Sequence, residues 1–396
     1  MIGIGLRAPL PPAVPMSCPA RVRIVSWNLW LIPFGGPWCL GRVQAIERCL
    51  CRHVGSMLAD PGVEDCLGIA ALQEAWAWRA GPLYPLVWLE AALQKRLLSS
   101  LFRGDREPLA LRAIFALSRV VQLAGALVTS VCAPPLLRAV LWSPKPVLAA
   151  SLRRAGLPHA TAAGEASFRH AGWPRESNRS ASAPCLLDCG LLLCTSRPPD
   201  ETGFEPFDWR GNAECVAHKG MEWVRFGGLA VLTTHMTFEY ADGGVQRGAQ
   251  QLQLARLAAR LLDEGAEQLL LVGDLNSALP HQTLPGRRNG PRPSCATPPS
   301  VYEKAWLGSH ASLDRLHEAF EAVDADLELR RMDTGEEPTC EDGTVDHVLC
   351  CARRSRPPGG VAYRAATSST VVDPRAEVSD HALVRCELEW RGGSGT

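Results

Sequence analysis

Residues 269–276 read Leu-Leu-Leu-Val-Gly-Asp-Leu-Asn, an apolar run that ends in a carboxylate and a carboxamide. Successive apolar residues of this kind predict a short strand that is buried on both faces. A polar side chain at the end of such a strand is fixed by the sheet and exposed by the loop that follows. Alternation along a strand would turn Asp274 and Asn276 to the same side of the backbone. The stretch therefore predicts a polar site at the edge of a buried sheet.

Further polar signatures lie along the chain, and most of them follow apolar runs. They are Trp27-Asn28 after 22–26, Gln73-Glu74 after 67–72, Thr234-His235 after 229–233, and Ser379-Asp380-His381. Each signature alone is typical of a turn or a helix cap. Together their imidazoles, amides and acids on one rim indicate a hard cation beside general acid–base groups. That combination of groups hydrolyses phosphate esters.

Strands alternate with helical patterns along most of the chain. Helices are predicted over 41–58 and 245–264, a hairpin at Gly227-Gly228, and further strands over 186–195, 345–351 and 381–390, the last two closing the second sheet. This order fits a four-layer α/β sandwich, in which two packed mixed sheets are flanked by helices. We predict one catalytic domain over residues 21–396, preceded by a flexible, proline-rich tail over residues 1–20.

The signatures resemble, in order and in company, those of the endonuclease/exonuclease/phosphatase superfamily, which has a DNase I-like fold. The resemblance runs from about Arg21 to Trp390, and within the superfamily it points to the neutral sphingomyelinases. The residues on which the resemblance rests are Asn28-Leu29-Trp30, Leu72-Gln73-Glu74-Ala75-Trp76, Cys189-Gly190-Leu191, His218-Lys219-Gly220, Thr233-Thr234-His235-Met236, Glu239-Tyr240, Arg247, Gln250, Gly273-Asp274-Leu275-Asn276, Val345-Asp346-His347 and Ser379-Asp380-His381. The Lys-Gly and Thr-His pieces, with Glu239-Tyr240, indicate the sphingomyelinase branch most narrowly.

The resemblance implies a metal site at Glu74 and Asn28. Glu74 would bind the ion directly, with Asn28 beside it. Oxygen ligands select a hard cation, and Mg²⁺ keeps several waters, so one or two carboxylates suffice to hold it. The expected cofactor is Mg²⁺, with Mn²⁺ as a substitute.

The resemblance also implies a general base for the attack of water on phosphorus. Histidine is largely unprotonated near neutral pH, which suits this role. We assign it to His381, with Asp346 as the carboxylate that fixes its tautomer. Asp274 and Asn276 would orient the attacking water and the phosphoryl oxygens, and Asp380 would support the metal or the histidine loop.

Two further residues are expected to contact the substrate phosphate, together with Asn276. Lys219 matches a lysine that neutral sphingomyelinases keep, and His235 would hydrogen-bond a phosphate oxygen or assist the leaving group. In those enzymes an acid five residues before the lysine pairs with it; here Glu214 occupies that position in place of aspartate. His347 would point away from Asp346 along a strand, so we predict that it is structural.

The overall charge gives the chain no general attraction to nucleic acid. The chain has 396 residues, with 41 basic and 41 acidic ones, for a formal net charge of zero. Because nucleic-acid affinity comes mostly from phosphate neutralisation, we expect no nucleic-acid partner. The 15 cysteines show no zinc-binding spacing and are expected to be reduced thiols. The first residues lack the pattern of a signal peptide, so the predicted location is the cytoplasmic side of a membrane.

The membrane expectation rests on an insertion over residues 87–160. It holds ten basic and three acidic residues, a net charge of +7, in a very apolar context. Within 109–131, Arg112, Arg119 and Gln122 share one side of a predicted helix. This pattern is typical of a helix that lies in a membrane interface and faces anionic headgroups.

Two alternatives for the insertion remain open. It would be a helical subdomain if its apolar face packed on the protein itself. It would span the membrane if residues 120–137 were continuous, but Pro134-Pro135 leaves about 14 residues, or about 21 Å, against the ~30 Å hydrocarbon core.

The leading function is a Mg²⁺-dependent neutral sphingomyelinase that cleaves sphingomyelin to ceramide and phosphocholine. A DNase-like endonuclease is the first alternative, although it would need a basic groove with aromatic residues. An inositol-phosphate phosphatase is the second, although the Cys-Asp-Arg signature expected around Asp346 is missing. A catalytically inactive scaffold that docks on membranes is the third, although every expected acid and histidine is present.

Overall fold

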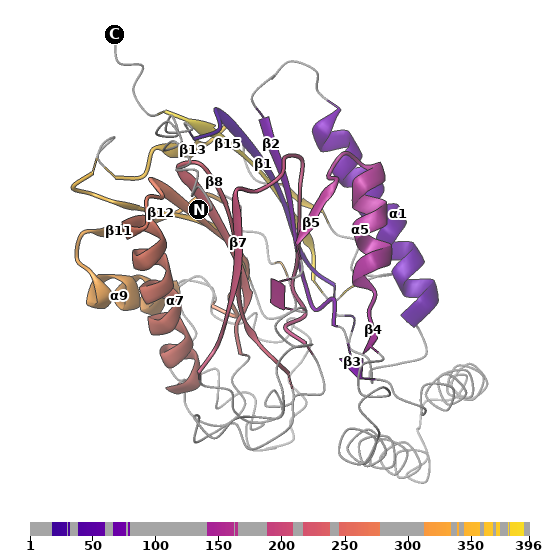
Figure 1. Cartoon of the computed structure of the whole chain (residues 1–396), viewed down its shortest axis with the longest axis horizontal. Coiled ribbons are helices and arrows are strands. Elements are labelled where there is room, and N and C mark those ends of the chain that lie inside the picture. The colour runs from indigo at the N-terminus through magenta and orange to yellow at the C-terminus, as the bar shows by residue number, and fades with distance from the viewer. Residues whose placement is uncertain are drawn as a thin grey trace, which may run out of the picture.

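Two β-sheets pack face to face, and helices cover the outer face of each sheet (Figure 1). The chain thus folds as the predicted four-layer α/β sandwich. A computed structural model describes residues 18–29, 31, 39–59, 66–76, 78–79, 141–161, 163–164, 188–208, 217–237, 245–277, 313–333, 339, 344–356, 360–366, 370–372, 379 and 381–391.

The sheets differ in size but share the same plan, with antiparallel strands around one parallel pair. The seven-stranded sheet runs β13 (Tyr363–Ala365), β15 (Leu383–Trp390), β1 (Arg21–Asn28), β2 (Cys66–Gln73), β6 (Leu192–Thr195), β5 (His159–Thr161), with β14 (Thr370–Val372) also on β15. The six-stranded sheet runs β11 (Leu327–Arg331), β12 (Asp346–Arg353), β10 (Gln268–Asp274), β9 (Leu229–His235), β8 (Gly220–Phe226), β7 (Glu201–Pro206). A separate pair joins β3 (Trp78–Arg79) to β4 (Leu141–Trp142). The parallel pairs are β1 with β2 and β9 with β10.

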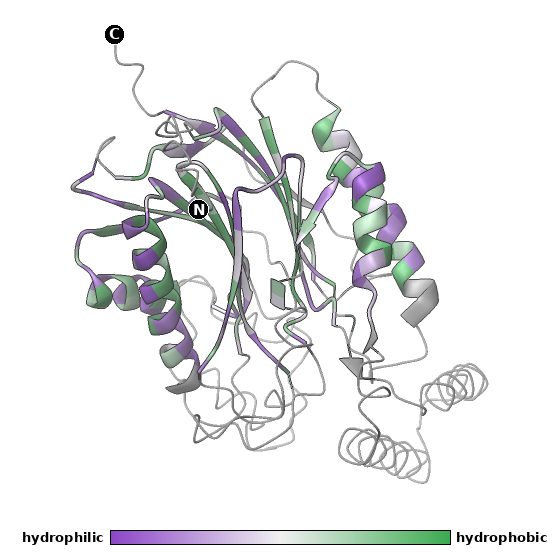
Figure 2. Ribbon diagram, in the orientation of Figure 1, coloured by the Kyte–Doolittle hydropathy of each residue, from purple (hydrophilic) through white to green (hydrophobic). Residues whose placement is uncertain are grey.

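Helices α1 (Cys39–Leu58) and α5 (Lys145–Arg154) cover the larger sheet, and α7 (Val245–Asp263) and α9 (Leu313–Val323) cover the smaller one (Figure 1). In Figure 2 the helices α1, α5 and α7 carry both hydrophilic and hydrophobic residues. This mixture is expected of a helix with one face on a sheet and the other in water.

The alternation of side chains along the strands decides which residues reach the space between the sheets. In β1, Val22 and Ile24 join the core between the sheets, whereas Val25 and Trp27 pack under α1. The same period of two applies in β10, where Leu270 and Val272 face inward. Continuing each inner row by two residues brings polar groups to the end of the core. The site therefore begins where the apolar inner rows end.

Most of the predicted elements are confirmed, and two are corrected. Helices 41–58 and 245–264 and the Gly227-Gly228 hairpin are present as α1, α7 and the β8–β9 turn. The predicted strand 186–195 is shorter, because Gly190 takes a left-handed conformation (φ 69°) and β6 begins only at Leu192. The strand at 383–390 belongs to the first sheet rather than the second, because it pairs antiparallel with β1.

Most of the predicted insertion, residues 87–140, lies outside the described residues, as do the first 17 residues of the tail. The end of the insertion is part of the folded body, since Leu148 and Leu152 of α5 are buried in the core under α1 and β5 pairs with β6. Among the helices that the structure describes, none combines the length and apolar character needed to cross a membrane.

Candidate active site

Three polar side chains form a row across the smaller sheet. The register pairs Asp274 of β10 with His235 of β9 on one side and with Asp346 of β12 on the other. All three follow inner rows of apolar residues, so their side chains point between the sheets. This arrangement explains why residues more than a hundred positions apart meet at one level.

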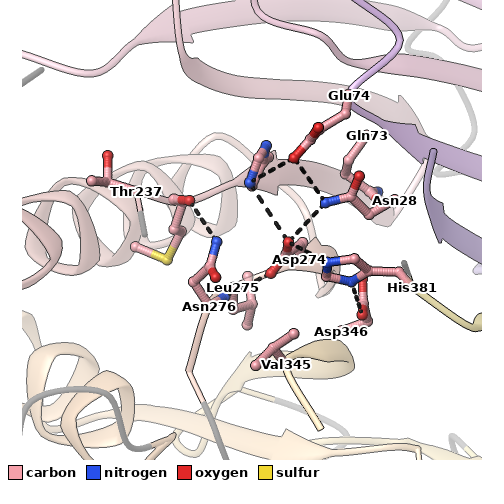
Figure 3. A network of polar contacts seen from close by, with 12 residues as sticks. Asn28, Gln73, Glu74, Thr237, Asp274, Leu275, Asn276, Val345, Asp346 and His381 are labelled. Atoms are coloured by element: carbon pink, nitrogen blue, oxygen red, sulfur yellow. Dashed lines mark hydrogen bonds and ion pairs between the residues drawn. The ribbon is translucent and has the colours of Figure 1, made fainter. Parts of the chain in front are cut away.

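The larger sheet contributes Asn28 and Glu74 to the same place. Asn28 ends β1, and Glu74 directly follows β2 in a left-handed conformation (φ 56°). The Asn28 amide Nδ2 donates to Glu74 Oε1 at 3.2 Å and to Asp274 Oδ2 at 2.9 Å (Figure 3). One amide group thus bridges carboxylates from the two sheets.

His381 completes the group from the segment that leads into β15. Its Nδ1 lies 2.8 Å from Asp346 Oδ2, and its Nε2 lies 3.9 Å from Asp274 Oδ2 (Figure 3). Trp27 Nε1 donates to the His381 carbonyl at 3.0 Å, and Ser379 Oγ accepts from the His381 amide at 3.1 Å. The ring is therefore fixed by Asp346, with Nε2 directed toward Asp274.

Burial shapes the electrostatics of this group. Asp274 is 1% exposed, and its burial, followed by the nearby charge of Asp346, raises its pKa from 3.8 to about 6. Burial, with the charges of Lys219 and His381, lowers the pKa of His235 well below 6.5. His235 is therefore neutral at neutral pH, although its Nε2 lies 3.7 Å from Glu74 Oε1 and 3.6 Å from Asp274 Oδ2.

The site requires a glycine directly before Asp274. Gly273 has a φ of 142°, and a Cβ at this position would come within 2.3 Å of the Thr234 carbonyl oxygen. Only glycine permits this backbone conformation together with so close an approach of β9 and β10. The close approach sets the separation between His235 and Asp274.

The donor set fits a divalent cation. Polar atoms of Asp274, Asp346 and His381 lie within 4.8 Å of one another, and because His381 Nδ1 is engaged with Asp346, carboxylate oxygens are the ligands left for an ion. Asp346 Oδ1 is buried and has no hydrogen-bond partner among the described residues. The side-chain nitrogen of Asn28 lies between the carboxylates of Glu74 and Asp274. A metal ion bound to Asn28 would require the side-chain oxygen instead, because an amide nitrogen is not a ligand for a hard cation. A turn of the Asn28 amide about its last torsion would present that oxygen.

A second group of polar contacts lies beside this cluster, around the carbonyl of Met236. That oxygen accepts from Asn276 Nδ2 at 2.9 Å and from Lys219 Nζ at 3.3 Å. The backbone of Asn276 is left-handed (φ 48°), and its backbone N–H donates to Asp274 Oδ1 at 2.9 Å. Strand alternation therefore does not explain why Asp274 and Asn276 lie together, because β10 ends at Asp274; a tight turn brings them together instead.

The structure gathers most of the predicted site residues in one place. Those gathered are Asn28, Glu74, Lys219, His235, Asp274, Asn276, Asp346 and His381. Asp380 and Glu214 lie outside the described residues. His347 points to the helix side, as its contacts with the Ser277 carbonyl (2.7 Å) and Asp333 (3.5 Å) show.

Sequence reasoning missed the residues that hold these groups in place. Gln73 Nε2 donates to Thr233 Oγ1 at 3.2 Å, which ties β2 to β9 beneath the site. Thr339 Oγ1 accepts from the Asp346 amide at 3.2 Å, and Ser379 Oγ donates to the Asn28 carbonyl at 2.7 Å. The Gln-Glu and Ser-Asp-His signatures contained Gln73 and Ser379, but their roles depend on contacts between distant segments.

Comparison with known proteins gives a family and several distant structures. The family model described as "Endonuclease/Exonuclease/phosphatase family" matches residues 25–381. Sphingomyelinase C from Streptomyces griseocarneus is 14% identical, with 93% of this chain and 99% of that chain covered, at a TM-score of 0.43. An endonuclease/exonuclease/phosphatase from Beutenbergia cavernae DSM 12333 is 14% identical, with 95% and 72% covered, at a TM-score of 0.47. A beta toxin from Staphylococcus aureus with bound magnesium ions is 10% identical, with 92% and 98% covered, at a TM-score of 0.44. No curated protein matches the sequence.

Proposed function

The chain belongs to the endonuclease/exonuclease/phosphatase family, and from that membership we propose that it is a Mg²⁺-dependent sphingomyelin phosphodiesterase. Members of this family are hydrolases that act on phosphodiester bonds. The observation that carries the proposal is the continuous set of contacts from Glu74 through Asn28 and Asp274 to His381 and Asp346. It combines a cluster of buried acidic side chains with a histidine held by a carboxylate.

In this proposal His381 takes a proton from the attacking water at Nε2, because Nδ1 is bonded to Asp346. The Asp346 carboxylate then stabilises the imidazolium that forms. The water oxygen bonds to phosphorus, the bond from phosphorus to the ceramide oxygen breaks, and that oxygen takes a proton from solvent. Asp274, 3.9 Å from His381 Nε2, lies where it would orient the attacking water.

Glu74 and Asn28 would hold the ion, with Asp274 beside them. A bound Mg²⁺ would offset the charge that builds on the phosphoryl and leaving oxygens. Mn²⁺ is expected to substitute, because it accepts the same oxygen ligands.

Lys219, Asn276 and His235 would bind the phosphate. Lys219 and Asn276 share the Met236 carbonyl, so their donor groups lie side by side. Neutral His235 would contribute a hydrogen bond rather than a charge. Asp380 remains proposed as a support for the metal or for the histidine loop.

The choice of sphingomyelin rests on the sequence. Lys219-Gly220 and Thr234-His235 with Glu239-Tyr240 match the neutral sphingomyelinase branch, and residues 87–160 are both basic and apolar. We propose that this insertion brings the protein to the cytoplasmic face of a membrane, with anionic lipids as its partners.

One experiment separates the candidate substrates. Purified protein is incubated with choline-labelled sphingomyelin vesicles, plasmid DNA or inositol phosphates, with Mg²⁺ or with a chelator. We expect the wild type to release water-soluble phosphocholine in Mg²⁺ but not in the chelator. Glu74→Ala and His381→Ala should release none under either condition. Nicked plasmid with intact lipid would support the nuclease. Release of phosphate from inositol phosphates would support the phosphatase, and no turnover of any substrate would support the inactive scaffold.

The membrane proposal has its own test. The deletion should span residues 87–140, since α5 and β5 belong to the folded body. We expect the deletion to abolish co-sedimentation with anionic vesicles and to reduce turnover on vesicles far more than on detergent-dispersed substrate. Equal losses on both substrates would make the segment structural.

A further inference from the structure

The turn formed by Met236 and Thr237, directly after β9, connects several groups of the site. The Met236 amide donates to the Asp274 carbonyl at 3.0 Å. The Met236 carbonyl accepts from both Asn276 and Lys219, as described above. The position of a single peptide unit therefore decides where two of the proposed phosphate-binding side chains lie.

Helix α7 holds this turn through its first two turns. Gln250 accepts from the Thr237 amide at 2.9 Å through Oε1 and donates to Thr237 Oγ1 at 2.7 Å through Nε2. Arg247 Nε donates to the Thr237 carbonyl at 3.2 Å. The amide, the carbonyl and the hydroxyl of Thr237 are thus all bonded to two side chains of one helix.

Both side chains that hold the turn are polar and buried. Arg247 and Gln250 are each 1% exposed, and burying a polar side chain has a desolvation cost that only good hydrogen bonds offset. Arg247 also places a cation in the first turn of α7, where the helix dipole disfavours positive charge. Aliphatic side chains would fill the same space but would leave the buried amide and carbonyl of Thr237 without these partners. The polar contacts therefore hold the buried turn in one position.

We propose that Gln250 and Arg247 are positioning residues, which act through the Met236–Thr237 turn to set Lys219 and Asn276 against the substrate phosphate. This inference rests on the proposed function, because that proposal assigns Lys219 and Asn276 to the substrate phosphate. Gln250 and Arg247 themselves do not contact the reacting atoms. Their effect passes from Thr237 to the Met236 carbonyl, and from that oxygen to the two donors.

The test compares two glutamines that differ in where their hydrogen bonds lead. Gln250→Met keeps the length of the side chain and removes both bonds to Thr237. Gln268→Met is the matched control, because Gln268 is also buried and bonds to the Gly360 carbonyl and the Ala362 amide. Gln268 begins β10 and Asp274 ends it, so the control lies about 20 Å from the site.

For Gln250→Met we expect kcat on sphingomyelin vesicles to fall about tenfold to hundredfold, because donors displaced from the phosphate stabilise the transition state poorly. KM should stay within about twofold, since lipid contacts are unchanged. Gln268→Met should lose about as much thermal stability as Gln250→Met, but its kcat should stay the same as that of the wild type. Gln250→Glu should recover most of the activity, because its carboxylate still accepts from the Thr237 amide and hydroxyl.

Hydrogen exchange supplies a readout that needs no turnover. In Gln250→Met, exchange should become faster in peptides covering 236–237 and 273–277, and in Gln268→Met it should not. Unchanged exchange in these peptides, or equal kcat in the two methionine variants, would overturn the inference. A wild-type protein that hydrolyses no phosphodiester would overturn the proposed function instead, and the exchange result would still decide whether Gln250 holds the turn.

Discussion

Replacing Asp346 with asparagine removes one charge from the centre of the site and nearly no volume. Asp346 is fully buried, and its Oδ2 lies 2.8 Å from His381 Nδ1. Asparagine at this position can accept one hydrogen bond but carries no charge to stabilise an imidazolium. The imidazole of His381 would also be free to adopt the other tautomer, with its proton on Nε2.

The loss of activity can be worked from this contact. A hydrogen bond to a charged group contributes about 1.5–3 kcal/mol. If it is made fully only when His381 is protonated, its loss lowers kcat/KM by roughly 10- to 150-fold. The wrong tautomer would add to this loss, so we expect at least a tenfold fall.

The effect on stability should have the opposite sign. Asp346 and Asp274 are two buried carboxylates of the same charge, and an oxygen of one lies within 4.8 Å of an oxygen of the other. At this separation their repulsion is on the order of 3 kcal/mol at an effective dielectric constant of 20. Asp346→Asn removes this repulsion, and the lost bond to His381 offsets part of the gain. The metal-free protein should therefore not become less stable.

The assay pairs phosphocholine release in Mg²⁺ with urea unfolding in a chelator, both at pH 8. The matched control is Asp333→Asn, because Asp333 contacts the neighbouring histidine, His347, on the other face of β12. The control should lose stability, since Asp333 also binds Arg331, and keep its activity. The reasoning would be refuted if Asp346→Asn kept its activity, or if it lost as much stability as Asp333→Asn.

Three further predictions concern single residues. Glu74→Gln should abolish hydrolysis and also the rise in melting temperature that Mg²⁺ causes in the wild type; an unchanged rise would move the metal elsewhere. Gly273→Ala should destabilise the protein by about 2–4 kcal/mol in chemical unfolding, because its Cβ would lie 2.3 Å from the Thr234 carbonyl; a loss below about 1 kcal/mol would show that β9 and β10 can separate there. Burial raises the pKa of Glu222 from 4.5 to about 7, so this group costs the wild type stability as the pH rises from about 4.5 to about 7. Glu222→Gln should be more stable than the wild type at pH 8, by about 3 kcal/mol at most, and the gain should fall close to zero at about pH 4; a gain independent of pH would contradict the assignment.

The sequence predicted the central strands of the sheets well, because a run of apolar residues is a local pattern. Continuous apolar runs identified β1, β9 and β10, and Asn28, His235 and Asp274, at or near the ends of these runs, lie together in the site. Alternation along a strand also predicted that His347 points to the side opposite Asp346, and the structure places it on the helix side of β12. Its neighbour Asp346 then had to face the other way, toward His381.

Features that depend on contacts between distant segments could not be predicted in this way. The strand at 383–390 pairs with β1, and no local pattern shows which sheet an antiparallel strand joins. Asn276 lies beside Asp274 because of a left-handed turn rather than strand alternation. Arg247 and Gln250 were visible as part of the resemblance, but their role became apparent only when Thr237 was found against α7.

The most direct measurement of the central claim is the anomalous scattering of Mn²⁺ in crystals of the protein. The account predicts a manganese peak next to the Glu74 carboxylate, at the end of the core between the two sheets. The peak should disappear in crystals of Glu74→Gln. A protein that hydrolyses its substrate with Mn²⁺ and yet shows its manganese peak elsewhere, with none beside Glu74, would contradict the account.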